Sequence, residues 1–258
     1  MRQCADPRFA AIHADMLGID LQQQPRWFRP LLIRSRRLQG MTGYNHWSRR
    51  WEYPWAILAA EFGDRTGRTL DVGGGGSPFS RYLARAGHDS HVADPSLDRG
   101  SSFVYDADKS MTQNLRSVAK RVLFRIAGIN SLWGLPQHHG ESAVHYAASP
   151  ADDLSYHDEH FDTVFCLSVM EHIPTALWDA CMREFGRVLR PGGRLILTLD
   201  MTTPEANRRL YRRLVEGTEL QLIGQPDYEV PLRSEEQQLR HPGHGYETIG
   251  LVWRKAGR

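Results

Sequence analysis

Four consecutive glycines, Gly73 to Gly76, interrupt the stretch TLDVGGGGSPFS between a short apolar run and a helical pattern. The run TLDVG is typical of a buried strand. PFSRYLARAG predicts a helix, because Ser77 precedes it as a capping residue, Pro78 occupies its first turn and Gly87 follows its end. A strand joined to a helix in this way presents free backbone N–H groups at the positive end of the helix dipole. Glycines there let a ligand approach the backbone closely.

Strands and helices continue to alternate after this loop. SHVAD and FDTVFCLSV are typical of strands, and a helix is expected from about Thr175 to Leu189, where RPGG stops it before the strand RLILTL. This alternation predicts an α/β fold with helices on both faces of a parallel sheet. Near the end of the chain, ELQLIG and YETIGLVWRK predict a pair of antiparallel strands that closes one edge of the sheet.

Residues 1–60 differ from this pattern and predict a helical, aromatic-rich cap on a main domain of residues 61–258. Trp47, Trp51 and Trp55 recur at four-residue steps, which places them near one face of a helix. Pro54 is expected to break that helix or to start a turn. The tryptophans either pack the cap onto the main domain or close over a ligand as a flap.

An insert at residues 100–142 makes one connection longer than a strand–helix–strand crossover requires. Within it, MTQNLRSVAKRVLFRIAG predicts an amphipathic helix with a basic face. The inserted helix is either a solvated surface element or a lid over the substrate that attracts anionic groups.

Charge and cysteine content narrow the class of protein. The 258 residues carry a net charge of +2, far from the strongly basic balance that would indicate nucleic-acid binding. The three cysteines are widely spaced and form no paired motif, which is typical of a reducing compartment. The first residues contain no continuous apolar segment of a secretory signal, and no run of about 18 apolar residues could span a membrane. We therefore expect a cytoplasmic protein without a membrane span.

The residues around the glycines distinguish two classes of cofactor. A dinucleotide loop needs a third glycine where this chain has Pro78 or Phe79, depending on the register, so both registers fail. Asp71, before the glycines, would repel a pyrophosphate and attract an ammonium group. Asp94, at the end of the next strand, is placed either to bind ribose hydroxyls or to cap the turn at Pro95. Together the two acids favour S-adenosylmethionine over a dinucleotide.

Three blocks of the chain resemble, in order, those of the class I S-adenosylmethionine-dependent methyltransferases. The blocks are LDVGGGGSPFSRYLARAGHDSHVADPS, DDLSYHDEHFDTVFCLSVMEHIP and EFGRVLRPGGRLILTLD, and GYNHWSRRWEYPW also resembles N-terminal segments of bacterial members. The likeness is greatest to the small-molecule branch that includes ubiquinone and menaquinone biosynthesis enzymes. It implies a Rossmann-like, doubly wound sheet of seven mostly parallel strands with an antiparallel C-terminal edge hairpin, and S-adenosylmethionine as the cofactor.

The resemblance also implies which residues contact the cofactor. Asp71 and Gly73 would hold the methionine amino group, Gly75 would lie under the cofactor, and Asp94 would bind the ribose. Residues 166–168, at the end of the fourth strand, would face the reactive end of the cofactor. The implied set is Asp71, Gly73, Gly75, Asp94, Pro95, Ala151, Asp152, Cys166, Leu167 and Ser168.

The contact to adenine departs from the family pattern. Pro150 stands where the family has an aspartate, so the usual carboxylate is missing. Asp152 or Asp153 would then substitute for it, and Ala151 would offer its backbone N–H.

Methyl transfer from a sulfonium asks the protein mainly to position a nucleophile and, where needed, to remove its proton. Glu171 and His172 follow the fourth strand and are the predicted catalytic residues, since a histidine there has a suitable pKa for a general base. The alternative is that His172 packs under the next helix while Glu171 is a first-turn acid. Tyr44, His46 and Tyr53 of the cap are predicted to line the acceptor pocket.

No metal site is predicted from the histidines. His138 and His139 adjoin, and His241 and His244 lie close together, but neither group has a recognised ligand spacing. We interpret both groups as parts of flexible loops.

These features predict an enzyme that transfers a methyl group from S-adenosylmethionine to an O, N or C atom of a small-molecule acceptor, in biosynthesis or secondary metabolism. An RNA or protein acceptor is the second reading, motivated by arginines near the N-terminus and by the basic inserted helix. The sequence CLSVMEHI replaces the Asn-Pro-Pro-Tyr-like motif of adenine and glutamine N-methyltransferases, which counts against it. A non-catalytic S-adenosylmethionine-binding protein is the third reading, motivated by the missing adenine-binding aspartate.

Overall fold

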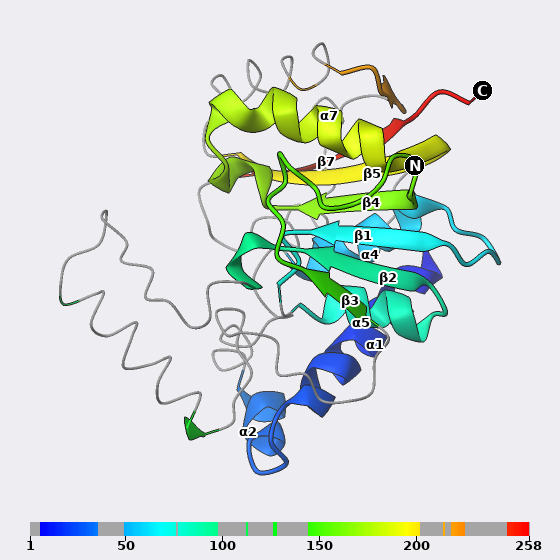
Figure 1. Ribbon diagram of the computed structural model, residues 1–258. Coiled ribbons are helices and arrows are strands. Elements are labelled where there is room, and N and C mark those ends of the chain that lie inside the picture. Colours follow the sequence, from blue (N-terminus) through cyan, green and yellow to red (C-terminus); the bar gives the residue numbers. More distant parts are fainter. Residues whose placement is uncertain are drawn as a thin grey trace.

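The architecture is that of a computed structural model, which describes residues 6–35, 49–75, 77–97, 144–201, 218–224 and 247–257, with single residues 112, 126, 127 and 214. Its seven-stranded sheet has the order β3-β2-β1-β4-β5-β7-β6 (Figure 1). The strands are β1 Arg68–Val72, β2 Asp89–Ala93, β3 Val144–Ala147, β4 Phe161–Leu167, β5 Leu189–Met201, β6 Gln221–Leu222 and β7 Glu247–Arg254. Strands β1 to β5 pair in parallel, and β7 runs antiparallel to both β5 and β6. The predicted doubly wound sheet with an antiparallel C-terminal edge is confirmed.

The order of the strands places a switch point between β1 and β4. The chain moves outward from β1 to β3, then returns to the other side of β1 and continues outward through β4 and β5. Val72 at the end of β1 lies opposite Cys166 near the end of β4. Loops that leave such a point diverge and open a crevice at the carboxyl ends of the strands. The glycine loop after β1 and the segment after β4 therefore start side by side at this point.

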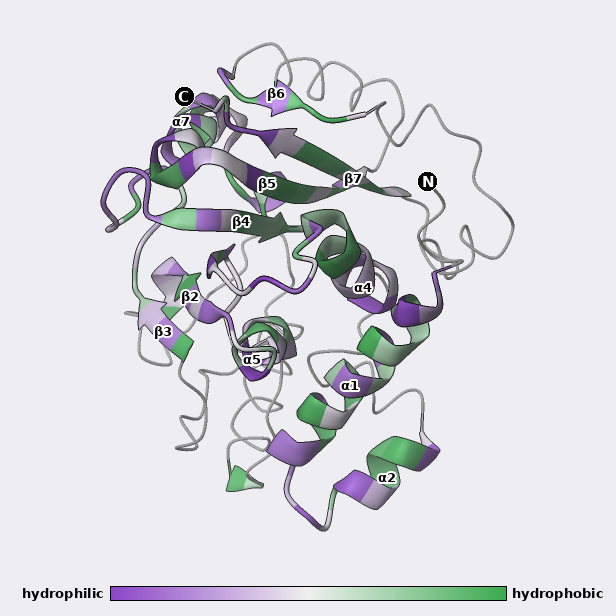
Figure 2. Ribbon diagram, turned by 90° about the vertical axis from the view of Figure 1, so that its right-hand side faces the viewer, coloured by the Kyte–Doolittle hydropathy of each residue, from purple (hydrophilic) through white to green (hydrophobic). Residues whose placement is uncertain are grey.

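Helices cover both faces of the sheet. Helices α1 (Pro7–Gln23), α4 (Arg49–Ala60) and α5 (Pro78–Arg85) lie on one face and α7 (Trp178–Val188) on the other, while the short α2 (Arg29–Arg34) lies farther out (Figure 2). Strand β4 shows why two cores form. Val164 and Cys166 pack in the cluster with α7, and Phe165 and Leu167 pack in the cluster with α1, α4 and α5. Successive side chains of a strand point to opposite faces, so an almost wholly apolar strand serves both cores.

Helix α4 joins the N-terminal residues to the sheet. Trp51 is fully buried, Trp55 is nearly so, and their rings stack at 5.2 Å between centroids. Both belong to the cluster that contains Phe165 of β4, so the packing interpretation holds for these two tryptophans, while Trp47 lies outside the described residues. The expectation that Pro54 breaks the helix is wrong, because α4 continues through it. Proline removes one backbone donor, and burial of the surrounding aromatic side chains outweighs that loss.

The predicted helix at residues 175–189 begins as the 3-10 helix η4 (Thr175–Leu177) and continues as α7. Glu184 interrupts the apolar face of α7 because its carboxylate has polar partners there. Its carboxylate accepts a hydrogen bond from the Leu154 backbone N–H at 2.8 Å and pairs with Arg187 at 2.7 Å. These bonds hold the segment after β3 against α7.

None of the helices in the described ranges is long and apolar enough to cross a membrane. The predicted inserted helix lies outside the described residues, apart from residues 112, 126 and 127.

Candidate active site

The glycine loop is tightly enclosed by side chains from neighbouring strands and loops. Gly73 and Gly75 have positive φ angles of 73° and 48°, which L side chains rarely adopt. A methyl group at Gly73 would lie 2.5 Å from Cγ2 of Val169, and one at Gly74 would overlap the Asp71 carboxylate. The loop therefore needs glycine at each of these three positions, and its backbone is partly exposed.

Asp71, in β1, lies directly beneath this loop. Its side chain is 3% exposed, and Oδ2 accepts a hydrogen bond from Ser80 Oγ of α5 at 2.9 Å. Burial raises the pKa of Asp71 to about 7, against the lowering effects of the Ser80 hydrogen bond and the Arg49 charge. Such a carboxylate lacks sufficient positive charge around it. A bound ammonium group would supply that charge.

Asp94 caps the turn at Pro95, one of the two alternatives that its sequence position suggested, and its other oxygen faces the glycine loop. Its Oδ1 accepts a hydrogen bond from the Ser96 backbone N–H at 2.8 Å and so caps the 3-10 helix η2, Pro95–Leu97. Its Oδ2 points toward the glycine loop, since a methyl group at Gly75 would lie 3.2 Å from it. Capping fixes the carboxylate while one oxygen remains directed at the crevice.

Strained backbone marks the end of β4. Ser168 has φ of 50°, an uncommon value for a residue other than glycine. Its N–H donates to both the carbonyl and the hydroxyl of Thr198 in β5, at 3.1 and 2.9 Å. Its hydroxyl donates a short hydrogen bond to Glu52 of α4. Two elements, β5 and α4, thus hold this turn in its unusual conformation.

A buried ion pair from α4, which was not predicted from the sequence, completes this side of the site. Glu52 is fully buried and accepts hydrogen bonds from Thr198 Oγ1 at 2.7 Å and from Arg49 at 2.8 Å. Arg49 also donates to the Leu167 carbonyl at 3.0 Å, and its guanidinium lies 5.4 Å from the centre of the Tyr53 ring. The available signal was an arginine and a glutamate three residues apart within a helix whose other residues are mostly aromatic or apolar.

Glu171 and His172 lie in the 3-10 helix η3 (Met170–His172), next to the loop that Val169 brings against Gly73. Glu171 Oε1 accepts a hydrogen bond from the Asp200 N–H at 3.2 Å, and its buried Oε2 has no hydrogen-bond partner among the described residues. Burial, followed by the charge of Asp200, raises the pKa of Glu171 to about 8. Partial burial, followed by the charge of Arg49, lowers the pKa of His172. At neutral pH, Glu171 is therefore largely protonated and the exposed His172 is largely neutral.

The other predicted contacts are distributed around the same end of the sheet. Ala151 is buried and Asp152 half-buried after β3, in the segment held by Glu184, while Pro95 is exposed. Cys166 is fully buried on the α7 side, where burial raises the pKa of its thiol, so it packs as a core residue.

Tyr53, predicted for the acceptor pocket, is buried with its ring 5.0 Å from that of Phe79 in α5. Burial raises the pKa of its hydroxyl to about 12. Tyr44 and His46 lie outside the described residues.

Comparison with known proteins identifies the segment that carries this site. Residues 70–197 match the family described as "Methyltransferase domain". The chain is 42% identical over 57 residues to the methyltransferase GfsG of Streptomyces halstedii, covering 22% of the chain and 20% of that protein. It is 30% identical over 142 residues to a ubiquinone biosynthesis O-methyltransferase of Xanthomonas oryzae pv. oryzae, covering 54% of the chain and 45% of that protein. The chain thus spans less than half the length of these curated relatives.

Among solved structures, the chain is similar to the Burkholderia thailandensis 1,6-didemethyltoxoflavin-N1-methyltransferase, which was crystallised with 1,6-didemethyltoxoflavin and S-adenosylhomocysteine. The two are 16% identical, with 88% of each chain covered and a TM-score of 0.48. The family match and the strand order together confirm the resemblance seen in the sequence.

Proposed function

We propose that this chain, which contains a class I methyltransferase domain, transfers a methyl group from S-adenosylmethionine to an O, N or C atom of a small-molecule acceptor. One observation carries the proposal. A buried carboxylate, Asp71, an enclosed glycine loop and a pre-oriented carboxylate, Asp94, meet where the loops diverge between β1 and β4.

The residues around this crevice fit the cofactor. The Asp71 carboxylate would pair with the methionine ammonium group, and Oδ2 of Asp94, which faces the glycine loop, would accept hydrogen bonds from the ribose hydroxyls. Gly73 and Gly75 leave the backbone bare for close approach. Ala151 and Asp152, on the other side of Asp94, are proposed to contact the adenine.

S-adenosylmethionine supplies an activated methyl group when bound, so the chain has to orient the acceptor and accept its proton. We assign the proton to His172, which is exposed and has a lowered pKa. Glu171 holds its own proton at neutral pH, so it can donate a hydrogen bond to an acceptor oxygen or nitrogen but is a poor base. The close approach of Val169 to Gly73 keeps both residues near the methionine end of the cofactor.

A small-molecule acceptor and a biosynthetic role are supported by the ubiquinone biosynthesis relatives. We place the reaction in the cytoplasm, which the free, buried Cys166 and Cys181 support.

Calorimetry with S-adenosylmethionine and S-adenosylhomocysteine tests the cofactor assignment. Asp94→Ala should weaken binding by about 1–3 kcal/mol, the value of a hydrogen bond to a charged group. Asp64→Ala, in an exposed turn, is the matched control and should leave binding unchanged. Unchanged affinity in Asp94→Ala would refute the ribose assignment. Cofactor binding without methyl transfer to a broad set of phenols, amines and carbon acids would instead favour a non-catalytic binder.

A further inference from the structure

A second cluster of polar side chains lies on the sheet away from the crevice. Asp89 is the first residue of β2, whereas Asp94 follows its last residue. At about 3.3 Å per residue, the two acids are separated by about 16 Å along the strand. Their surroundings also differ, since Asp89 is accompanied by histidines and Asp94 by glycines.

Strand register brings two of these histidines together. His91 of β2 and His145 of β3 are direct partners in the parallel pairing, so their side chains lie on the same face. Their rings stack with 4.6 Å between centroids. Asp89, two residues before His91, points to the same face because side chains alternate along a strand.

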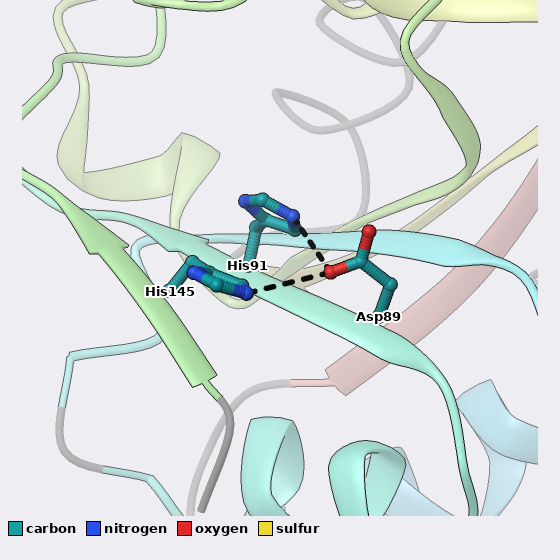
Figure 3. A group of neighbouring side chains, drawn as sticks. All are labelled: Asp89, His91 and His145. Carbon is teal, nitrogen blue, oxygen red and sulfur yellow. Dashed lines mark hydrogen bonds and ion pairs between the residues drawn. The ribbon is translucent and has the colours of Figure 1, made fainter.

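All three side chains converge on one point (Figure 3). Asp89 Oδ1 lies 3.0 Å from His91 Nε2 and 3.6 Å from His145 Nε2, and all three ligand atoms lie within 4.8 Å of one another. Four ligands at the usual zinc–nitrogen and zinc–oxygen distances are about 3.4 Å apart in a tetrahedron. The three atoms therefore need only a small rearrangement to surround one ion.

We propose that Asp89, His91 and His145 form a binding site for a divalent transition-metal ion such as zinc, with water as the remaining ligand. Two imidazoles and one carboxylate favour zinc, cobalt, nickel or copper over magnesium and calcium, which prefer oxygen ligands. The His145 side chain is 61% exposed and the His91 side chain 13%, so the ion can enter from the solvent on the β3 side. These ligands come from two distant segments, so the sequence shows no ligand spacing that would predict a metal site here.

Neighbouring groups shape the site. Arg68 Nε donates to Asp89 Oδ2 at 2.6 Å, which fixes the carboxylate with Oδ1 directed at the two histidines. Oδ1 now pairs with His91 Nε2, and metal binding would replace that contact. The same guanidinium adds positive charge that opposes a dication, and it also contacts His160 Nδ1 at 3.4 Å. The His160 ring lies 5.9 Å from that of His91, outside the group of three. The bound ion would link the edge strand β3 to β2 and so stabilise the folded chain.

Zinc calorimetry on the full chain, first treated with a chelator, tests this site. The wild type should bind zinc and melt at a higher temperature in its presence. His145→Asn should weaken zinc binding at least about tenfold and abolish the melting shift. This variant should fold normally because the side chain is largely exposed. His157→Asn removes a nearby exposed histidine that is not among the three ligands, so it should retain binding.

The chain has 12 histidines, so the comparison between variants is decisive. Wild-type cobalt absorption bands that disappear in His145→Asn and persist in His157→Asn would support the site. Absence of zinc binding in the wild type, or equal affinity in the wild type and His145→Asn, would overturn it.

Discussion

Asp71→Asn should stabilise the protein while it impairs cofactor binding. Asparagine keeps the shape of the side chain and an oxygen that can accept the hydrogen bond from Ser80, but it carries no charge. Asp71 is 3% exposed, and its pKa rises from 3.8 to about 7 on burial. At about 1.4 kcal/mol per pKa unit, this difference of about three units corresponds to about 4 kcal/mol.

The direction of the pH dependence of stability follows from the number of protons that the folded and the unfolded chain bind. Between pH 3.8 and about 7 the folded chain keeps a proton on Asp71 that the unfolded chain has lost. The contribution of this group to stability is therefore complete below pH 3.8 and is lost as pH rises through about 7. At pH 8 the ionised carboxylate opposes folding, so Asp71→Asn should be more stable than the wild type by as much as about 4 kcal/mol. At pH 4 the two should differ little.

Urea unfolding at several pH values, without cofactor, measures this difference, and calorimetry measures S-adenosylmethionine binding. We expect affinity to fall about ten- to a hundredfold, because the ammonium group loses its charged partner. Asp64→Asn, in an exposed turn, should change neither quantity. A variant that is less stable than the wild type at pH 8 would show that the Asp71 carboxylate is not an uncompensated buried anion. A variant that binds the cofactor as well as the wild type would show that Asp71 does not pair with the ammonium group.

Two further substitutions test the packing of α4 against the sheet. Glu52→Gln should lower the free energy of unfolding by about 3–5 kcal/mol, because it leaves the Arg49 guanidinium without its buried counter-ion. A loss below about 1 kcal/mol in urea unfolding would mean that the pair does not stabilise the fold. Gly250→Ala should lower the melting temperature, because the new methyl group would lie close to the Trp55 ring and overpacking costs about 1–3 kcal/mol. An unchanged melting temperature would show that this ring shifts without cost.

Much of the fold could be predicted because local patterns and the sheet agree. Helix α5 begins at Pro78 and ends before Gly87 as predicted, and β4 is the apolar run from Phe161. Ser77 precedes α5, but its side chain makes no capping hydrogen bond to the helix. Pro54 was misjudged because its local effect is opposed by the burial of neighbouring aromatic residues, which depends on distant strands. Local propensity determines the secondary structure of a segment only when such long-range packing is weak.

The candidate site likewise contains residues that the sequence predicts and residues that only the fold reveals. Asp71 and Asp94 could be proposed as cofactor contacts from sequence, because each stands at a short distance from the glycine loop. The Arg49–Glu52 pair could be seen only as two charges on a helix, since their hydrogen bonds to Leu167 and Thr198 cross more than a hundred positions of the chain.

The sequence by itself determined the alternation of strands and helices, the cofactor class and the position of the glycine loop. These depend on periodicity, backbone freedom and charge, which are properties of short segments. Only the tertiary structure decided why each glycine is required, since Gly73 is confined by Val169 from the neighbouring loop and Gly74 by the carboxylate of Asp71 beneath it. Tertiary packing also buries Asp71, which raises its pKa, and sets the strand register that places His91 beside His145. Neither can be read from a short segment, because burial and register arise only when distant segments pack together.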